Sequence, residues 1–596
     1  MAEYLSPGVY VEEFDSGIKA MEGVSTSTAG FIGMAQKGPV RGLPVLITSM
    51  ADYQRRFGGY LSERVYGQLR FLPYAVEQFF NNGGSSCYVM RVCAQEEEKQ
   101  VAAEGDQQGG KGAATASGCV KTAAEGTEEK TFLSLTAVNP GAWGNSLQAK
   151  FVPMLKSRTD VTIKKEGENI SYTAKDAAGY QQGDLVFLQC AAESAASFYS
   201  VVDKTDGKQI FLKWDGAAAP GEDPAAGFLY LVEWGLMIWD ETASEQYENV
   251  SFNPDRSTYV DYVLKKSQLA SAKGNMANLA SGTLEKLLGS GEEQAFSVTF
   301  QGGDDGAIAF DASMYLGKDG APDKRTGLAA FKTISDVSIM AIPGITDKAV
   351  QSALVSHCES MGNRFAILDM PLEHKEVAQL QEFRENVDSS YAAMYHPWLQ
   401  CYDPLAKRNV FLPPSGSIAG IYGRTDNSRG VHKAPANEIV KNCTGLSVNY
   451  NEAEQGKLNP KGINLIRALP GQGIRVWGAR TCSSDGNWKY VNVRRLFLFI
   501  EESIKVNTNW AVFEPNDEML WSRVEGTIRV FLTTQWRNGA LAGTTADEAF
   551  FINIGKSTMT EDDILNGRLI CVIGVAPVRP AEFVIFRITQ KMESAQ

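Results

Sequence analysis

The sequence lacks the features that would mark a metalloenzyme or a nucleic-acid-binding protein. It has only four histidines in 596 residues, and none forms an HExxH pair or stands at metal-ligand spacing from a carboxylate. Its nine cysteines are scattered without a CxxC pair, which favours reduced thiols over disulfides or a zinc site. The formal net charge of −13 argues against nucleic acid as a partner, because neutralising phosphates requires a basic face.

Long hydrophobic segments are missing as well. No stretch of about 18 apolar residues is present, so neither a transmembrane helix nor direct membrane insertion is expected. The opening sequence MAEYLSPGVYVEE has no basic region followed by an apolar run, and no secretory signal is expected. We therefore expect the chain to be made and folded in a cytoplasm. Its 44% hydrophobic residues and its length suggest about three or four globular domains.

Alternating apolar and amphipathic segments predict an α/β core in two separated parts, residues 24–94 and 326–485. The expected strands are 29–34, 45–48, 87–92, 337–342, 365–368 and 391–395, and the expected helices are 70–80, 347–361 and 376–387. Short, mostly apolar strands separated by helices indicate βαβ units and a parallel sheet covered on both faces.

The composition changes between the two parts of the core. Residues 95–130 are dominated by Ala, Gly, Glu, Gln and Lys, which predicts a flexible linker. Residues 131–265 contain short strand-like runs between turn signals, such as Leu185–Leu188 and Gln209–Leu212, and predict an inserted β-rich domain. Residues 266–325 are expected to be a connecting segment.

The last part of the chain, residues 486–596, predicts an α+β domain. Val493, Leu496 and Ile500 share one helical face, and Leu520, Val524 and Ile528 share another in a helix that begins near Asn516-Asp517.

Both ends of the chain resemble strands without a local partner. Residues 1–23 contain a short strand and a Gly- and Ser-containing hinge, and a second strand is expected close to the C-terminus. An unpaired strand is a template for the backbone of another chain. The residues expected to pair between subunits are Val9, Tyr10, Val11, Glu12, Phe583, Val584, Ile585, Phe586 and Ile588.

One set of residues resembles a serine-protease triad in its order along the chain. Asp369, His396 and Ser415 or Ser417 follow in the chain order of subtilisin-type serine proteases. However, Pro397 follows His396 directly, and the serines follow Pro413-Pro414 rather than a nucleophile loop, so we expect ordinary loop residues. A run from Gly105 to Lys111 nearly matches a phosphate-binding loop but continues with Gly112 instead of Ser or Thr. The sequence therefore predicts no catalytic site, cofactor or metal.

Several segments resemble the contractile tail sheath family. The similarity is densest over residues 410–596 and scattered through the first 150. The segments are Ser6-Pro-Gly-Val-Tyr-Val-Glu-Glu13, Asn82-Gly-Gly-Ser-Ser-Cys-Tyr-Val-Met-Arg-Val92, Pro140-Gly-Ala-Trp-Gly-Asn145, Pro413-Pro-Ser-Gly-Ser-Ile-Ala-Gly420, Ala434-Pro-Ala-Asn437, Trp477-Gly-Ala-Arg-Thr481, Trp488-Lys-Tyr-Val-Asn-Val-Arg-Arg-Leu496, Phe513-Glu-Pro-Asn516, Gly539-Ala-Leu-Ala-Gly543 and Arg579-Pro-Ala-Glu-Phe583.

The resemblance implies a subtilisin-like α/β core without protease activity and a C-terminal domain that faces an inner tube. It further implies a structural subunit that polymerises helically with itself, contracts, and drives the tube through a target envelope. Its partners would be the tail tube protein, the baseplate and the terminator or cap. The particle would be a virion tail or a phage-tail-like injection particle, assembled in the bacterial cytoplasm. The inserted domain would face outward.

Charged residues on the C-terminal helices are candidates for the tube contact. They are Arg494, Arg495, Glu501, Glu502, Glu525 and Arg529, which are expected on exposed helix faces. Two alternatives remain open at this point, namely a subtilisin-like hydrolase and an adhesion protein that binds through the inserted β domain.

Overall fold

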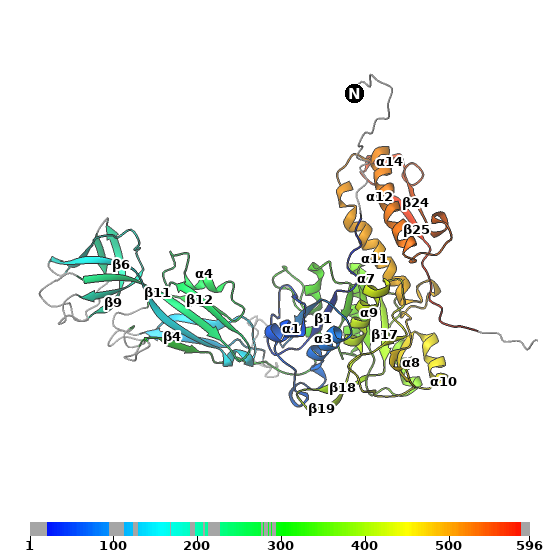
Figure 1. Ribbon diagram of the computed structural model, residues 1–596, viewed down its shortest axis with the longest axis horizontal. Coiled ribbons are helices and arrows are strands. Elements are labelled where there is room, and N and C mark those ends of the chain that lie inside the picture. Colours follow the sequence, from blue (N-terminus) through cyan, green and yellow to red (C-terminus); the bar gives the residue numbers. More distant parts are fainter. Residues whose placement is uncertain are drawn as a thin grey trace, which may run out of the picture.

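The computed structural model describes residues 21–94, 112–122, 129–166, 169–190, 197–206, 209–212, 227–275, 278, 284, 288 and 294–585. The predicted strand at 9–12, the run 105–111, and Phe586 and Ile588 lie outside the described residues. The described chain forms an elongated molecule (Figure 1). The β-rich insert extends to the left of the α/β core, and the C-terminal domain stands above the core on the side away from the insert.

The core is built on a nine-stranded sheet in the order β2-β3-β1-β15-β16-β17-β22-β23-β20. Its strands are β1 (Ala29–Gly33), β2 (Val45–Ile47), β3 (Cys87–Arg91), β15 (Ile339–Ala341), β16 (Phe365–Asp369), β17 (Ala392–His396), β20 (Glu438–Ile439), β22 (Ile463–Leu469) and β23 (Gly473–Val476). The strands from β3 to β22 run parallel, whereas β2, β23 and β20 add antiparallel edges. The mixed α/β architecture predicted from the sequence is confirmed.

Helices cover both faces of this sheet. One face carries α1 (Met50–Phe57), α3 (Phe71–Asn81) and α9 (Ser415–Arg429). The other carries α7 (Lys348–Met361), α8 (Val377–Arg384) and α10 (Glu452–Leu458). Every residue of β1, β16 and β17 is buried, which explains their continuous apolar sequences. Smaller elements complete the core: α2 (Glu63–Tyr66), α6 (Ala312–Leu316) and a sheet of β18 (Leu399–Asp403), β19 (Arg408–Leu412) and β21 (Gly445–Leu446).

Ser415 and Ser417 were expected in a loop, but they form the first turn of α9. This helix packs on α3 with almost no space between the two backbones. A Cβ atom at Gly416 would lie 2.4 Å from the carbonyl oxygen of Ala75, and one at Gly420 would lie 2.4 Å from that of Phe79. The glycines of the Pro413–Gly420 motif therefore serve close helix packing, which a loop assignment misses.

The insert contains two β structures joined by two long strands. Its elements are β4 (Ser117–Thr122), β5 (Lys130–Ala137), β6 (Gln148–Glu166), β7 (Asn169–Ala174), β8 (Leu185–Cys190), β9 (Phe198–Asp206), β10 (Gln209–Leu212), β11 (Gly227–Trp239), β12 (Ser244–Val250), α4 (Val260–Leu264), β13 (Ala270–Gly274) and β14 (Phe296–Thr299). In the distal half, β6-β7-β10-β9-β8-β11 closes into a barrel because β11 also pairs with β6. In the proximal half, the same two strands pack with β12, β14 and the β13-β5-β4 sheet around a second core.

The predicted limits of the insert were too narrow. Strand β4 lies within the segment expected to be a flexible linker, and β13 and β14 lie within the expected connection. The sequence Ser117–Thr122 has few large side chains, yet pairing with β5 buries Val120. Gly118 also fits against β14, where a Cβ would lie 2.6 Å from the Thr299 carbonyl oxygen. Tertiary packing thus overrides the composition of this segment.

Charged groups that are buried at the interface hold the insert on the core. The Lys37 ammonium lies 2.9 Å from Asp240 and donates to Thr242 in the turn between β11 and β12. Arg91, at the end of β3, donates to the Pro140 carbonyl and lies 3.7 Å from Asp305. These contacts fix the direction in which the insert leaves the core.

The C-terminal domain packs two long helices against a two-stranded sheet. Its elements are α11 (Val491–Asn507), α12 (Glu518–Arg537), α13 (Ala546–Ala549), β24 (Phe550–Ile554), α14 (Glu561–Leu565) and β25 (Cys571–Val575). Asp517 caps α12 by accepting from the Leu520 amide, as the sequence predicted for this region. The apolar faces predicted for both helices meet in the core of this domain.

Asp369 connects the sheet to α9. This buried carboxylate is the last residue of β16, and it accepts from the amides of Gly344 and Ser415 at 2.9 Å each and from the Ser415 hydroxyl at 2.6 Å. Burial raises the pKa of Asp369 to about 6, although these hydrogen bonds lower it in part. The folded state thus binds this proton more tightly than the unfolded state does.

The raised pKa predicts how Asp369 affects stability. Its contribution is fully present below about pH 4 and is lost as the pH rises through about 6, with a total of about 2–3 kcal/mol. In Asp369→Asn this dependence disappears. The unfolding free energy of the wild type minus that of the variant should therefore fall between pH 4 and pH 7 in chemical denaturation. Asp388→Asn is the control, since hydrogen bonds from Ser484 lower the pKa of Asp388, so its contribution stays nearly constant between pH 4 and pH 7 and is lost only at lower pH. Parallel profiles for wild type and Asp369→Asn would contradict this account.

Candidate functional site

The residues that follow the chain order of a protease triad do not form one. Asp369 and Ser415 meet, but the Nε2 atom of His396 lies 3.0 Å from the Tyr450 hydroxyl, and its Nδ1 atom has no partner among the described residues. Burial lowers the pKa of His396 to about 3, so the ring is neutral near pH 7. All three side chains are buried, and the geometry offers neither a base for Ser415 nor access for a substrate.

The junction of the N-terminal segment, the core and the C-terminal domain is organised by one ion pair. Arg495 of α11 binds Asp426 of α9 through two hydrogen bonds of 2.9 and 2.6 Å, and both side chains are almost fully buried. Arg495 also donates to the Thr26 carbonyl at 2.7 Å, and the Thr26 hydroxyl donates to Asp426 at 2.7 Å. The guanidinium lies over the ring of Tyr422, 4.6 Å from its centre. Three parts of the chain are thereby joined at one point.

For two of the predicted tube-contact residues, the expectation of an exposed position is wrong. Arg494 and Arg495 are 7% and 4% exposed rather than on an open helix face. Arg494 stacks on Trp488, 3.4 Å from the ring centre, and also lies over Tyr391. The reason is that the first turns of α11 lie between the core and the C-terminal domain, so every side of the helix is covered there.

The other four candidates lie nearer the surface. Glu501 is exposed, whereas the Glu502 side chain is mostly covered and pairs with Lys505 at 3.2 Å. Glu525 and Arg529 form an ion pair of 2.7 Å along α12, in which Arg529 is exposed and Glu525 is half-buried. These two residues present a charged pair on the outer side of the C-terminal domain.

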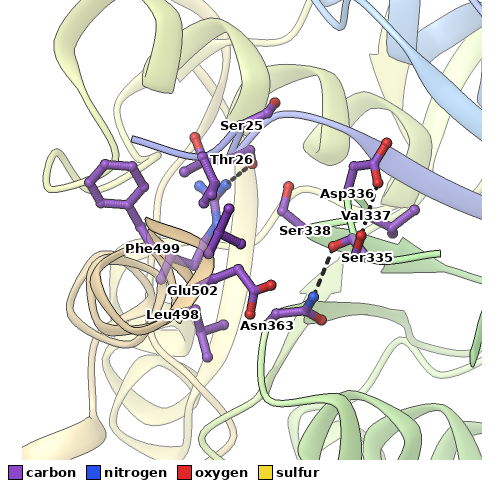
Figure 2. Close-up of a pocket in the computed structure, with 13 residues that line it drawn as sticks. Ser25, Thr26, Ser335, Asp336, Val337, Ser338, Asn363, Leu498, Phe499 and Glu502 are labelled. Carbon is purple, nitrogen blue, oxygen red and sulfur yellow. Dashed lines mark hydrogen bonds between the residues drawn. The ribbon is translucent and has the colours of Figure 1, made fainter. Parts of the chain in front are cut away.

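A cavity of about 280 Å³ lies beside the Arg495 ion pair (Figure 2). Its walls come from the N-terminal segment at 24–26, the loop 335–338 with Asn363, and α11. The lining mixes apolar side chains such as Leu498 and Phe499 with the carboxylates of Asp336 and Glu502. Because three parts of the chain form it, its volume depends on how the C-terminal domain is seated on the core.

The predicted C-terminal strand is only partly within the described residues. Phe583, Val584 and Ile585 are 73%, 68% and 79% exposed and have no strand pairing. The nearby β24–β25 sheet has two strands, and neither outer edge carries another strand of the described chain. Its outer face exposes Phe551 and Val572. The structure thus contains open strand edges and uncovered apolar side chains in the same domain.

The described residues contain no group of three or more His, Cys, Asp or Glu side chains arranged to hold a metal ion. Within the same ranges, every helix is too short or too polar to cross a membrane.

Two family models match consecutive parts of the chain. The phage tail sheath protein central domain matches residues 317–482, and the phage tail sheath C-terminal domain matches residues 483–591. The boundary between the two matches falls just before α11, where the structure passes from core to C-terminal domain.

Curated relatives carry the same description. A prophage major tail sheath protein of Pseudomonas aeruginosa is 26% identical over 46% of this chain and 72% of its own length. The tail sheath protein of Escherichia phage P2 is 26% identical over 35% of this chain, and that of Vibrio phage KVP40 is 30% identical over 25%. The alignments span 54% and 23% of these two proteins.

Solved structures share the fold over nearly the whole chain. The PVC sheath complex of an extracellular contractile injection system, in its contracted state, is 20% identical with a TM-score of 0.51, covering 100% of this chain and 99% of that one. A sheath tail protein from Listeria innocua is 11% identical with a TM-score of 0.51 and coverage of 94% and 96%. The two matching domain models and the curated tail sheath relatives together identify the chain as a contractile tail sheath subunit, and the solved structures share its fold.

Proposed function

We propose that this sheath subunit polymerises helically around an inner tube and contracts to drive the tube through a target envelope. The observation that carries the proposal is the two-stranded β24–β25 sheet, which no further strand of the described chain extends. A two-stranded sheet is marginal in water and becomes more stable when further strands join it. The chain's own terminal strands, at 9–12 and 583–588, are the proposed additions, supplied by neighbouring subunits.

Strand addition is suited to a polymer because each link is weak and repeated. A short added strand makes about four backbone hydrogen bonds, each worth about 1 kcal/mol net. Burial of its Val, Phe and Ile side chains adds to this, so one link contributes several kcal/mol. Such a link is insufficient for an isolated dimer but strong when every subunit is held at several points. The 1–23 segment would let the cores move while the links persist.

The proposed partners follow from this assembly. They are further copies of the chain, the inner tail tube protein, the baseplate, and the terminator or cap. The particle is either a virion tail or a phage-tail-like injection particle, assembled in the bacterial cytoplasm. Purified subunit mixed with its tube protein should form tubes with helical striation in electron microscopy.

The core is proposed to be subtilisin-like in topology but inactive. The parallel sheet with helices on both faces supports this, as does the position of Asp369 at the end of a strand and Ser415 at the start of a helix. The buried Asp369–Ser415 pair serves as a structural link in this reading.

The two terminal segments, residues 1–14 and 583–588, are called the arms, and shortening or altering them tests the proposed strand addition. Deleting residues 1–14 should leave a folded, soluble subunit that cannot form a stable sheath, because one linking strand is lost. Ile585→Pro should act in the same direction but more weakly, since it removes at most one ladder hydrogen bond. Ile585→Val is the control, because valine keeps the strand preference. Circular dichroism checks folding and electron microscopy checks assembly. Long contractile sheaths from the truncated protein would exclude the arm model.

The C-terminal domain is proposed to face the tube, through the exposed charges of its helices. With Arg494 and Arg495 buried, the Glu525–Arg529 pair of α12 is the clearest remaining candidate. An interface from which the tube must slide free is expected to be modest and electrostatic.

Exchanging the two charges tests this contact without changing the net charge. Glu525→Arg combined with Arg529→Glu keeps an ion pair on α12 but inverts its direction. Sheath–tube co-assembly should become several-fold weaker at moderate salt, as measured by co-sedimentation. The same exchange at the exposed Lys121–Glu129 pair of the insert is the control. Equal co-assembly by both exchanged variants would remove α12 from the tube contact.

The insert is proposed to be dispensable for polymerisation. Its two ends lie close together, because the Ala113 amide donates to the Ala94 carbonyl and Ala114 bridges to Asp304. Two strand spacings are about 10 Å, which a short linker can close at small entropic cost.

Replacing residues 95–303 by a short Gly-Ser linker should therefore give a folded subunit that still assembles with its tube. Arg91 keeps Asp305 nearby, and Lys37 gains water in place of Asp240. Sheath formation is scored by electron microscopy against the full-length chain. A shortened subunit that folds but does not assemble would show that the insert takes part in polymerisation.

A further inference from the structure

Three separate sequence motifs meet at a single carboxylate. Glu582 belongs to the Arg579–Phe583 segment near the end of the described chain. Its Oε1 atom accepts from the Nε atom of Arg480 at 2.8 Å, and its Oε2 atom accepts from the Nη2 atom at 2.6 Å. Arg480 comes from the Trp477–Thr481 motif. Tyr490, from the Trp488–Leu496 motif, donates its hydroxyl to Oε2 at 3.2 Å. The proposed function gives these motifs no separate role, yet the fold brings them together.

Two more groups complete the set of donors. The side-chain amide of Asn459 donates to Oε1 of Glu582 at 2.6 Å, and the Lys489 ammonium lies 3.8 Å from Oε2. Every one of these partners lies in the core or at its boundary with α11. Glu582, in contrast, follows the C-terminal domain in the chain. The carboxylate therefore fastens the end of that domain's chain back onto the core.

The receiving side of this contact is rigid. Arg480 is nearly buried, and its backbone is held by Asn464 of β22, which accepts from the Arg480 amide and donates to the Arg480 carbonyl. Arg480 also bridges to Tyr490. Burial acts to raise the pKa of Glu582, but the hydrogen bonds from Arg480 and Asn459 outweigh it and lower the pKa, so the group is charged near neutral pH.

The chain changes character on both sides of Glu582. Upstream, the Val578 amide donates to the Ala540 carbonyl, and the Asn492 side chain donates to the Val578 carbonyl. Immediately downstream, Phe583, Val584 and Ile585 are exposed. Glu582 is thus the last residue of the described chain that strong side-chain contacts fasten.

We propose that Glu582 is a positioning residue that fixes where the C-terminal arm leaves the subunit. This inference rests on the proposed function, in which the arm adds a strand to a neighbouring subunit. With Glu582 held, the arm begins at Phe583 on the core. Without it, the chain is free from about Arg579, four residues earlier. The local concentration of the arm at its acceptor then falls, because the tether is longer and its starting direction is lost.

A bidentate Arg–carboxylate contact also suits a link that carries load. Its two parallel hydrogen bonds define direction as well as distance. Tension that a neighbour applies to the arm would be taken up by the core through Arg480, and the small β24–β25 sheet would be spared.

The test measures the subunit and the sheath separately. In Glu582→Gln, which keeps the shape but loses the charge, chymotrypsin should cleave after Phe583 at least tenfold faster, because the chain on the N-terminal side of that bond is no longer fastened. Amide hydrogen exchange in α11 and α12 should be unchanged. Arg480→Lys keeps the charge but loses the two parallel hydrogen bonds of the guanidinium, so it should give an intermediate increase in rate. Glu561→Gln removes an equally negative but exposed residue of α14 and is the matched control.

Assembled sheaths of Glu582→Gln should dissociate at lower salt than those of the wild type and of the Glu561→Gln control. Unchanged cleavage after Phe583 would overturn the proposal. Faster cleavage with unaltered salt tolerance would also overturn it, because the contact would then be local only. If the wild type forms no sheath with its tube protein, the proposed function fails, and the cleavage data alone decide whether Glu582 fastens the chain.

Discussion

The arrangement of the subunit depends on the buried contact between Arg495 and Asp426. Taking two charges out of water is costly, and the cost is offset only where the geometry is good and the remaining hydrogen-bonding groups are satisfied. Here the guanidinium binds both carboxylate oxygens and the Thr26 carbonyl, and it lies against Tyr422. Removing one partner from such a pair costs about 3–5 kcal/mol. This contact therefore joins the C-terminal domain and the segment before β1 to the core, and the contacts of Arg494 with Tyr391 and of Glu582 with Arg480 support it.

Much of the core could be read from local sequence because local and tertiary preferences agree there. Phe365–Asp369 and Ala392–His396 are apolar except at Asp369 and His396 and are buried on both faces, as expected for central strands of a parallel sheet. The helix after Asp347 begins where its side chain accepts from two backbone amides. The family resemblance also rested on real contacts, since Gly416 and Gly420 permit the close packing of α9 on α3.

Elsewhere local sequence and tertiary environment disagree. Arg494 and Arg495 carry charged side chains of the kind usually found at the surface, and only the position of α11 between two domains buries them. Strand β4 has the composition of a linker, and only its pairing with β5 makes it a strand. For Phe583–Ile585 the structure of one chain shows exposed apolar side chains, and a partner strand must come from another molecule if the proposal is correct. Such residues cannot be assigned from a window of sequence, because their neighbours are distant in the chain or outside it.

The continuity of β6 and β11 through both halves of the insert has a mechanical consequence. A strand of 19 residues spans about 60 Å, and it is stiffened by its antiparallel neighbour over most of that length. The insert is in effect a stiff projection that is attached to the core at its base, where the buried cations Lys37 and Arg91 form ion pairs. A rotation of the core by about 10° would sweep its tip through about 10 Å, given the length of the strand. Any small turn of the subunit is thus amplified into a large lateral displacement at the far end of the insert.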